Sequence, residues 1–347
     1  MKNRKLRNYL LSFIIALAVI GCVFIPIPYY IEQPGSTIDL KELITVNDKK
    51  DESSGSFSLT SVGIRQASVV TALKAKTSPF QELVSEKELF GGASGEEYDQ
   101  IQKYYMASSQ NAAIEQALKL ANRPYTFAFK GVYVMSVLPN SSFSGKVAVG
   151  DTVTQVDGKK FESSQEFMDY VKGKNVGDEV TIDYLHQEES KKATGQLIEL
   201  ETDKKAGIGI TLVDHTTIES EDEVEFHVDN IGGPSAGLMF TLEIYEQLTG
   251  NDLRKGKKIA GTGTMDNQGN VGRIGGIDKK VASASQEGME IFFAPDDEIT
   301  ETEKAYDPNI QSNYQEAKKA LKKLNSDMVI VPVKTLQDAI DYLEKME

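Results

Sequence analysis

Ser235 is the residue of this chain whose surroundings best suit nucleophilic chemistry. It lies in the segment 229–237 (Asp-Asn-Ile-Gly-Gly-Pro-Ser-Ala-Gly), between an expected strand at 224–228 and an expected helix that ends at Gly250. Glycines let backbone N–H groups approach a substrate carbonyl, and the positive end of a helix favours a developing oxyanion. Serine is also a preferred helix N-cap after a Gly-Pro turn. These residues alone therefore indicate either a nucleophile or a cap.

A serine nucleophile needs a base, and the chain offers only three histidines. His186 falls in a β-rich block, and we interpret His215 and His227 as structural histidines because neither has a catalytic context. A lysine can replace histidine where burial disfavours its charged form and lowers its pKa. The single cysteine, Cys22, lies in an apolar N-terminal stretch, which excludes a cysteine nucleophile in the rest of the chain.

Two adjacent lysines follow a Gly-Gly turn at the start of an expected helix. Counting about 100° per residue, Ile277, Val281 and Ala284 define the apolar face, and Lys280 lies at its edge. Lys279 points about 200° away from Ile277, toward solvent. We therefore predict that Lys280 is drawn inward, with a snorkelling side chain as the alternative, and that Lys279 is a surface charge.

The sequence predicts that residues 1–31 form a membrane anchor. Residues 8–31 carry no charged side chain, and the apolar run can cross a hydrocarbon core of about 30 Å. Four cations precede the run, so the positive-inside rule predicts a single-pass protein of the cell membrane with its catalytic part outside the cell. Tyr29 and Tyr30 would lie at the far interface. A cleaved signal peptide and lipidation of Cys22 remain as alternatives.

Beyond the anchor, we expect a polar linker over residues 32–55, a first part of the main domain over 56–125, and a β-rich block over 126–200. Turn signals separate short apolar strands in this block, and Asp157-Gly158 is typical of a two-residue hairpin. The block resembles a bacterial PDZ domain in five pieces, namely residues 131–134, 138–142, 149–153, 156–158 and 176–180.

The PDZ resemblance implies a peptide-binding groove in this block. An extended peptide would add as a β-strand beside the strand that begins with Gly131, Val132, Tyr133 and Val134. A small β-rich domain without a ligand is the alternative interpretation.

Several separated segments resemble the proteolytic domain of the Lon family, namely residues 232–237, 262–263, 272, 274–277 and 280. The resemblance implies that Ser235 and Lys280 form a Ser-Lys dyad and that Thr262 orients the lysine. With the anchor and the PDZ block, the chain resembles the membrane-anchored Lon-like proteases of Gram-positive bacteria, of the YlbL/SepM type.

Residues 105–113 resemble an N-terminal helix of the same protease domain, so the PDZ block would be inserted between residues 56–125 and 201–347. We expect backbone N–H groups of Gly232, Gly233 and Ala236 to hold the oxyanion. Many Lon proteins carry an acidic residue three positions before the serine, where this chain has Gly232. A Gly-x-x-x-x-Gly-Lys-Ser/Thr phosphate loop does not occur in the sequence, so no ATP-driven unfolding is expected.

Charge and composition exclude other classes of protein. The chain of 347 residues carries 38 Lys+Arg and 52 Asp+Glu, a net charge of −14, which disfavours nucleic-acid binding. One cysteine and three histidines argue against a metal centre, and no cofactor is expected.

The sequence therefore predicts an α+β multidomain chain, with a Lon-type Ser-Lys protease domain, an inserted PDZ-like domain and one N-terminal transmembrane helix. Its expected function is that of an ATP-independent serine endopeptidase acting on peptides or exposed protein segments, secreted signalling peptides among them. The partners would be these substrates and the membrane, with self-association left open. A catalytically inactive, membrane-tethered peptide-binding scaffold is the alternative.

Overall fold

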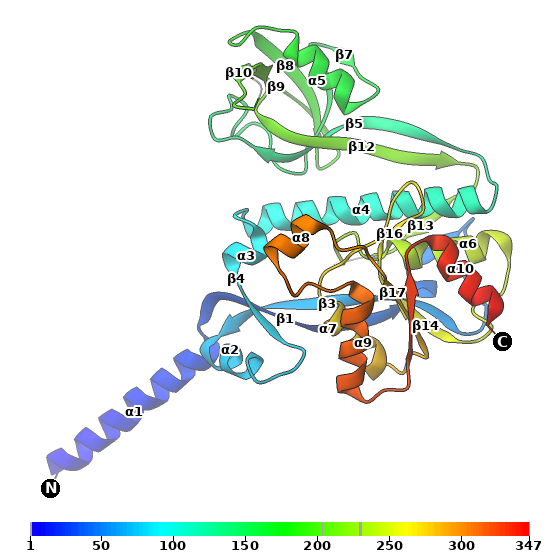
Figure 1. The fold of residues 1–347 in the computed structure, drawn as a ribbon. Helices are drawn as coiled ribbons and strands as arrows, with labels where there is room; N and C mark the ends of the chain where they lie inside the picture. Colours follow the sequence, from blue (N-terminus) through cyan, green and yellow to red (C-terminus); the bar gives the residue numbers. More distant parts are fainter. Residues whose placement is uncertain (1, 203, 229–230, 347) are drawn as a thin grey trace.

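The computed structural model describes residues 2–202, 204–228 and 231–346. A projecting N-terminal helix leads into a large domain, and a small β-rich domain lies on the opposite side of the large domain from that helix (Figure 1). The small domain is formed by residues 125–220, and the large domain is formed by the chain on either side of it, 26–120 and 221–346. This arrangement confirms the mixed α+β fold expected from the sequence.

The helix α1 (Lys2–Phe24) is long and apolar enough to cross a membrane. Its segment Arg7–Phe24 has a mean hydropathy of 1.9 over 18 residues and packs into no core. It ends just before Pro26, as the sequence predicts, because proline lacks the N–H that would continue the helix.

A six-stranded sheet forms the middle layer of the large domain, in the order β18-β17-β14-β3-β1-β4. The pairs β1–β3 and β1–β4 are antiparallel, and the pairs from β3 through β14 and β17 to β18 are parallel. The strands are β1 (Pro26–Asp39), β3 (Ser56–Ser68), β4 (Glu82–Ser85), β14 (Lys258–Gly261), β17 (Ile291–Pro295) and β18 (Val329–Val333).

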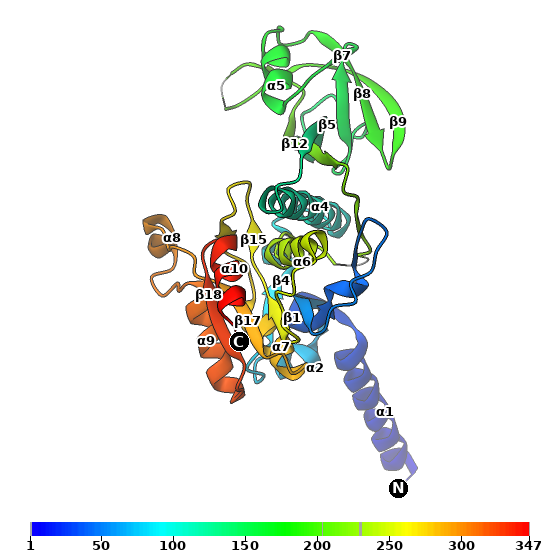
Figure 2. The ribbon, with the colours of Figure 1, turned by 90° about the vertical axis from the view of Figure 1, so that its right-hand side faces the viewer.

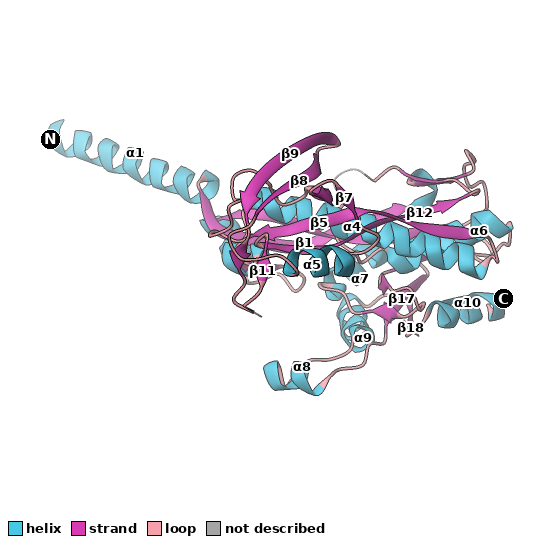
Figure 3. Cartoon of the chain, turned by 90° about the horizontal axis from the view of Figure 1, so that it is seen from above, coloured by secondary structure: helices cyan, strands magenta, loops and turns pink. Residues whose placement is uncertain are grey.

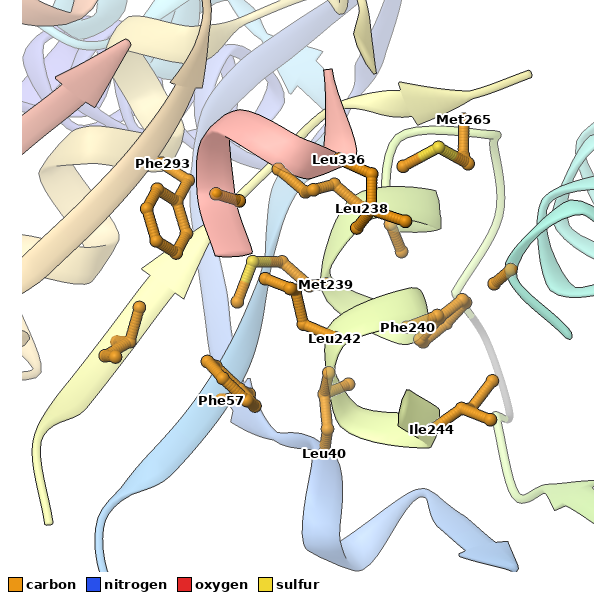
Figure 4. Packing of buried hydrophobic residues seen from close by; sticks show 14 of the residues in the cluster. Leu40, Phe57, Leu238, Met239, Phe240, Leu242, Ile244, Met265, Phe293 and Leu336 are labelled. Carbon is orange, nitrogen blue, oxygen red and sulfur yellow. The ribbon is translucent and has the colours of Figure 1, made fainter. Parts of the chain in front are cut away.

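Helices cover both faces of this sheet (Figure 2). One face carries α4 (Gly95–Leu120), α6 (Gly237–Thr249) and α10 (Leu336–Lys345), and the other carries α7 (Ile277–Gln286) and α9 (Asn313–Leu324). Figure 4 shows the core of the first face, where Leu238 and Leu242 of α6 pack toward Phe57 of β3 and Leu336 of α10. Burying these side chains fixes α6, and with it the loop that precedes α6, against the sheet.

Shorter elements complete the large domain. They are η1 (Leu40–Glu42), β2 (Ile44–Val46), α2 (Val69–Ala75), α3 (Glu86–Phe90), β13 (Val224–Phe226), β15 (Thr264–Met265), β16 (Val271–Gly272) and α8 (Glu301–Tyr306). The sequence predicts α6 to end at Gly250, and this residue is its left-handed C-cap at φ 69°.

The linker expected over residues 32–55 is wrong, because most of it is built into the large domain. Strand β1 extends to Asp39 inside the sheet, and β2 pairs with β13. Asp51 forms an ion pair with the fully buried Arg254, which also contacts Glu243 and Glu246 of α6. A buried guanidinium needs these carboxylates, so the segment before β3 is held by charge as well as by packing.

The small domain is a twisted antiparallel sheet in the order β12-β5-β6-β8-β9, with one helix and short flanking strands. Asp157 and Gly158 form the expected hairpin turn, both at positive φ, between β6 and β7. The elements are β5 (Tyr125–Val137), β6 (Thr152–Val156), β7 (Lys159–Lys160), α5 (Ser164–Lys172), β8 (Glu179–His186), β9 (Glu189–Gln196), β10 (Ile198–Glu199), β11 (Ala206–Gly207) and β12 (Ile210–Ser220).

The expected boundary at residue 200 falls short of the end of this domain, because β12 pairs with β5 along its whole length. Figure 3 shows β5 and β12 running along α4. Among the described residues, four hydrogen bonds join the small domain to this helix: Tyr133 Oη to Gln100 O (3.2 Å), Tyr104 Oη to Asp214 O (3.1 Å), Asn111 Nδ2 to Thr216 O (2.8 Å) and Tyr125 Oη to Glu115 Oε1 (3.3 Å). The helix α4 is thus packed between the two domains.

Candidate active site

The loop before α6 carries Ser235. Its first residues, Asp229 and Asn230, lie outside the described residues. Helix α6 begins at Gly237, and its N-cap is Ala236, which makes no side-chain capping bond. The cap interpretation of Ser235 is therefore wrong. The Ser235 hydroxyl instead faces the first turn of α7, where Lys280 Nζ lies 2.7 Å from Ser235 Oγ.

Lys280 is buried, with only 3% of its surface exposed. Its amine lies 2.8 Å from the carbonyl oxygen of Thr60 and 3.1 Å from Thr262 Oγ1, in addition to Ser235 Oγ. These three partners are all uncharged, so nothing in this set offsets the cost of burying a cation. Burial lowers the pKa of Lys280 from its usual 10.5 to about 7. A neutral amine is thus accessible near neutral pH.

Thr262 joins the lysine to the backbone of the serine loop. Its hydroxyl donates to the carbonyl oxygen of Ser235 at 3.0 Å and accepts from Lys280 Nζ. The N–H of Gly263 donates to the same Ser235 carbonyl at 2.9 Å. The position of Thr262, fully buried after β14, is the one that the sequence interpretation assigned to orienting the lysine.

The directions of two backbone N–H groups in the serine loop, those of Ser235 and Ala236, are fixed by hydrogen bonds to the carbonyl group of the same peptide. In a planar trans peptide the C=O and N–H groups point in opposite directions. The Pro234 carbonyl accepts from Ser109 Oγ of α4 at 3.0 Å, which fixes the direction of the Ser235 N–H. The bonds to the Ser235 carbonyl likewise fix the Ala236 N–H. Neither N–H has a partner within the described ranges, so both can receive an oxyanion.

Gly232 and Gly233 allow the serine loop to pack closely against α4. The N–H of Gly233 donates to the carbonyl oxygen of Gln102 at 3.1 Å, so this donor is occupied. A Cβ atom at Gly232 would lie 2.8 Å from Cβ of Gln102, and Gly233 has a φ of 87°. Of the three residues expected to hold the oxyanion, Gly233 has its N–H occupied, whereas the N–H of Ala236 has no partner among the described residues.

Ser109 was missed by the sequence interpretation. It lies in the helical stretch that resembles the protease domain, but nothing in the sequence separates it from its exposed neighbour Ser108. Ser109 is almost fully buried, and only the fold brings its hydroxyl to the Pro234 carbonyl.

Lys279 is not the surface charge that helical geometry predicts, because it too is only 3% exposed. Its amine lies 2.9 Å from Glu82, 3.5 Å from Asp278 and 3.7 Å from Glu32. Burial alone would lower the pKa of Lys279, but the hydrogen bond with Glu82 and the other carboxylates raise it overall. The two neighbouring lysines thus differ in their partners: Lys279 is stabilised as a cation and Lys280 is not.

A cavity of about 1030 Å³ opens beside Ser235 and Lys280. It lies where the pairing of β1 with β3 is interrupted between Pro34 and Thr37. Its walls come from β1, β3, α4 and the serine loop, and they include the apolar side chains Ile38, Leu43, Leu59, Met106 and Ile231. A cavity of this size and lining can hold an extended peptide segment.

The peptide groove expected beside Gly131–Val134 is not open in this structure. These residues lie in β5, whose two sides are paired with β12 and β6. The sheet has two edge strands, β12 and β9. Of these, β12 faces α5, and the N–H of Ser164 in α5 donates to Asp214 of β12 at 2.9 Å. Beside α5, a peptide could therefore add at the outer side of β12. The feature of the sequence that could have indicated β12 as the strand bordering the groove is the Gly-Ile-Gly segment 207–209, just before this strand.

Models of two known domain families match the chain, and their matches meet at residues 192–197, before β12, the strand that the structure adds to the small domain. A family model for a PDZ domain matches residues 105–197, and one for the C-terminal proteolytic domain of Lon protease (S16) matches residues 192–343. No curated protein matches the chain.

Several solved structures resemble about a quarter of it. The PDZ domain of an SdrC-like protein of Listeria monocytogenes is 43% identical, with 25% of this chain and 90% of that chain covered and a TM-score of 0.24. A Geobacillus thermodenitrificans protein is 34% identical, with 24% and 95% covered and a TM-score of 0.22. The chain carries a PDZ domain together with the C-terminal proteolytic domain of the Lon (S16) proteases.

Proposed function

We propose that this chain is a membrane-anchored serine endopeptidase that works without ATP and uses Ser235 as nucleophile and Lys280 as base. The observation that supports the proposal most strongly is the 2.7 Å contact between the Ser235 hydroxyl and a buried lysine amine that has no countercharge among the described residues. If Ser235 were only a helix cap and Lys280 only a surface lysine, the lysine would not need to be buried and the two side chains would not need to touch.

The hydrogen bonds around the amine can be made by its neutral form, which burial favours. A neutral amine has two N–H donors and one lone pair, whereas the ammonium form has three donors and no lone pair. The Thr60 carbonyl can only accept, and Thr262 has already used its hydrogen on the Ser235 carbonyl, so it also accepts. In the neutral form these two acceptors take both N–H groups, and the lone pair can accept the proton of the Ser235 hydroxyl. In the ammonium form the third N–H donates to Ser235 Oγ instead.

The reaction then follows from these contacts. Ser235 Oγ bonds to the substrate carbonyl carbon while its proton moves to Lys280 Nζ. The N–H groups of Ser235 and Ala236 stabilise the negative charge that develops on the carbonyl oxygen. Lys280 gives the proton to the leaving amine, and in its neutral form it then activates the water that hydrolyses the acyl-enzyme.

Peptides and exposed protein segments, including secreted signalling peptides, are the substrates we propose. The cavity beside Ser235 has room for an extended segment but not for a folded domain. The PDZ domain would present these substrates by adding their C-terminal residues along the outer side of β12.

The catalytic domain is proposed to lie outside the cell. The cations at the start of α1 would remain in the cytoplasm, since positively charged flanks are retained there. A protease added to intact spheroplasts should remove a C-terminal tag from the protein, and a tag that is digested only after lysis would contradict this topology.

The proposed activity can be tested with the full chain in detergent and a diverse pool of peptides, with the products sequenced. Cleavage is expected for the parent protein and should be lost in Ser235→Ala and in Lys280→Arg, because an arginine does not give up its charge. Ser108→Ala is a suitable control, since Ser108 is exposed and lies outside the site.

Two outcomes would refute the proposal. Equal cleavage by the parent and the Ser235→Ala protein would assign the activity to a contaminant or to another residue. Peptide binding without cleavage by the folded parent protein would instead favour the inactive peptide-binding scaffold.

A further inference from the structure

The short helix α2 exposes an apolar face that no described residue covers. Val69, Val70 and Leu73 are 42%, 44% and 62% exposed, although all three are large aliphatic residues. The opposite face of the helix is held by Ala72 and Ala75, which are buried against Ile31 of β1 and its neighbours. Three aliphatic side chains on a seven-residue helix form an unusually apolar patch for a surface exposed to water.

The position of this face is set by strand pairing. Pro26, two residues after the end of α1, pairs with Ser68, the residue directly before α2. Paired residues of neighbouring antiparallel strands lie about 5 Å apart. The start of α2 is therefore separated from the end of α1 by this one strand pair and a few residues of chain. Figure 1 shows α2 beside the inner end of α1.

The span of α1 places this point at a membrane surface. The 18-residue segment Arg7–Phe24 extends about 27 Å as a helix, close to the thickness of a hydrocarbon core. If α1 crosses the bilayer, its inner end at Phe24 lies at the interface, and α2 lies at the same depth.

The charges along the chain on either side of α2 also suit a phospholipid surface. The chain carries 52 acidic residues, yet none falls between residues 53 and 81, where Arg65, Lys74 and Lys76 are the only charged side chains. Lys74 and Lys76 are exposed. An acidic protein is repelled by anionic lipid, so a locally basic, apolar surface is where it can approach one.

We propose that α2 lies in the headgroup region of the membrane, with Val69, Val70 and Leu73 inserted among the lipids and with Lys74 and Lys76 on anionic phospholipid headgroups. This proposal rests on the proposed anchoring by α1. It gives the large domain a second membrane contact and therefore a fixed orientation, with the PDZ domain on the side facing away from the bilayer (Figure 2).

Tryptophan fluorescence can test the proposal, because the chain contains no tryptophan. Single-tryptophan versions of the full chain are reconstituted in vesicles of phosphatidylcholine and phosphatidylglycerol, with and without brominated lipids as quenchers. Leu73→Trp reports on α2. Phe13→Trp reports on α1, and Tyr306→Trp is the water-exposed control, since Tyr306 is 95% exposed in α8.

We expect Leu73→Trp to emit at shorter wavelength than Tyr306→Trp and to be quenched by lipids brominated near the headgroup. Phe13→Trp should be quenched by lipids brominated deep in the acyl chain. Quenching of Phe13→Trp with a water-like Leu73→Trp would overturn the α2 proposal and leave the anchoring intact. If neither is quenched, the anchoring fails as well. A blue-shifted Leu73→Trp that bromine does not quench would assign the face to a protein contact and also overturn the proposal.

The lysines are tested in the Leu73→Trp background. Quenching should be stronger with phosphatidylglycerol than with phosphatidylcholine alone, and Lys74→Gln with Lys76→Gln should remove the difference. Equal quenching in both lipids by the parent would overturn the role of the two lysines.

Discussion

Changing the pH through neutrality should switch the proposed base on, because the pKa of Lys280 is about 7. An ordinary lysine with a pKa of 10.5 is neutral in only about one molecule in 3000 at pH 7, whereas Lys280 would be neutral in about half. The shift of about 3.5 pKa units corresponds to about 5 kcal/mol, the free energy by which burial disfavours the cation. Since Lys280 is buried, solvent screening does not diminish this cost.

The expected pH profile of cleavage follows from the fraction of molecules in which Lys280 is neutral. We expect kcat/KM for a peptide without titrating groups to rise about tenfold per pH unit below pH 6, to bend near pH 7 and to level off above about pH 8. The assay measures initial cleavage rates across this range with the full chain in detergent. Circular dichroism at each pH and return of activity after a jump back to pH 8 serve as controls for unfolding.

The lowered pKa of Lys280 also predicts how the free energy of unfolding depends on pH. A depressed pKa means that the unfolded chain binds more protons than the folded chain between about pH 7 and pH 10.5, so stability rises with pH in this window. From pH 7 to pH 9, the free energy of unfolding of the parent should increase by about 2 kcal/mol relative to Lys280→Met. Contributions of other groups cancel in this difference.

A specific result would refute this reasoning. If kcat/KM kept rising tenfold per unit to about pH 10, Lys280 would be an ordinary charged lysine and could not act as base at neutral pH. A parent protein whose stability changed with pH just as that of Lys280→Met does would lead to the same conclusion.

Three further substitutions test particular contacts. Ser109→Ala should lower kcat about tenfold without changing KM, because the Ser235 N–H loses its fixed direction, and an unchanged kcat would remove this positioning role. Lys279→Met should lower the free energy of unfolding by about 1–3 kcal/mol in thermal melts while the folded protein keeps its kcat, and a selective loss of kcat would contradict this. Arg254→Met leaves its three carboxylate partners buried without a cation and should cost about 3–5 kcal/mol in urea unfolding, whereas an unchanged midpoint would show that the cluster contributes little.

The sequence predicted the local elements around the site well, because their signals are local. A Gly-Pro turn followed by apolar residues predicts α6, and a Gly-Gly turn followed by an amphipathic stretch predicts α7. The contact between Ser235 and Lys280 came from a family resemblance rather than from periodicity. No local pattern indicates which distant lysine meets a given serine.

The elements that the sequence missed depend on pairing between distant segments. Strand β1 contains Pro26, Pro28 and Pro34, which are typical strand breakers, but two of them flank irregularities in the β1–β3 register, where a missing N–H is tolerated. The misplacement of Lys279 has the same origin. Once β1 and β4 cover α7, the side of the helix that faced solvent in the helical projection becomes buried.

Lys280 lies far along the chain from its partners, and this separation determines when the site can form during synthesis. Its amine contacts Thr60, which precedes it by 220 residues, and Ser235, which precedes it by 45. A ribosome makes the chain from its N-terminus, so a nascent chain that has not yet been extended through α7 has the proposed nucleophile but not the proposed base. The small domain, contained in residues 125–220, can fold before that point. Cleavage by the proposed dyad would thus await synthesis of the chain through α7, and this delay would shield the growing chain and the machinery that handles it.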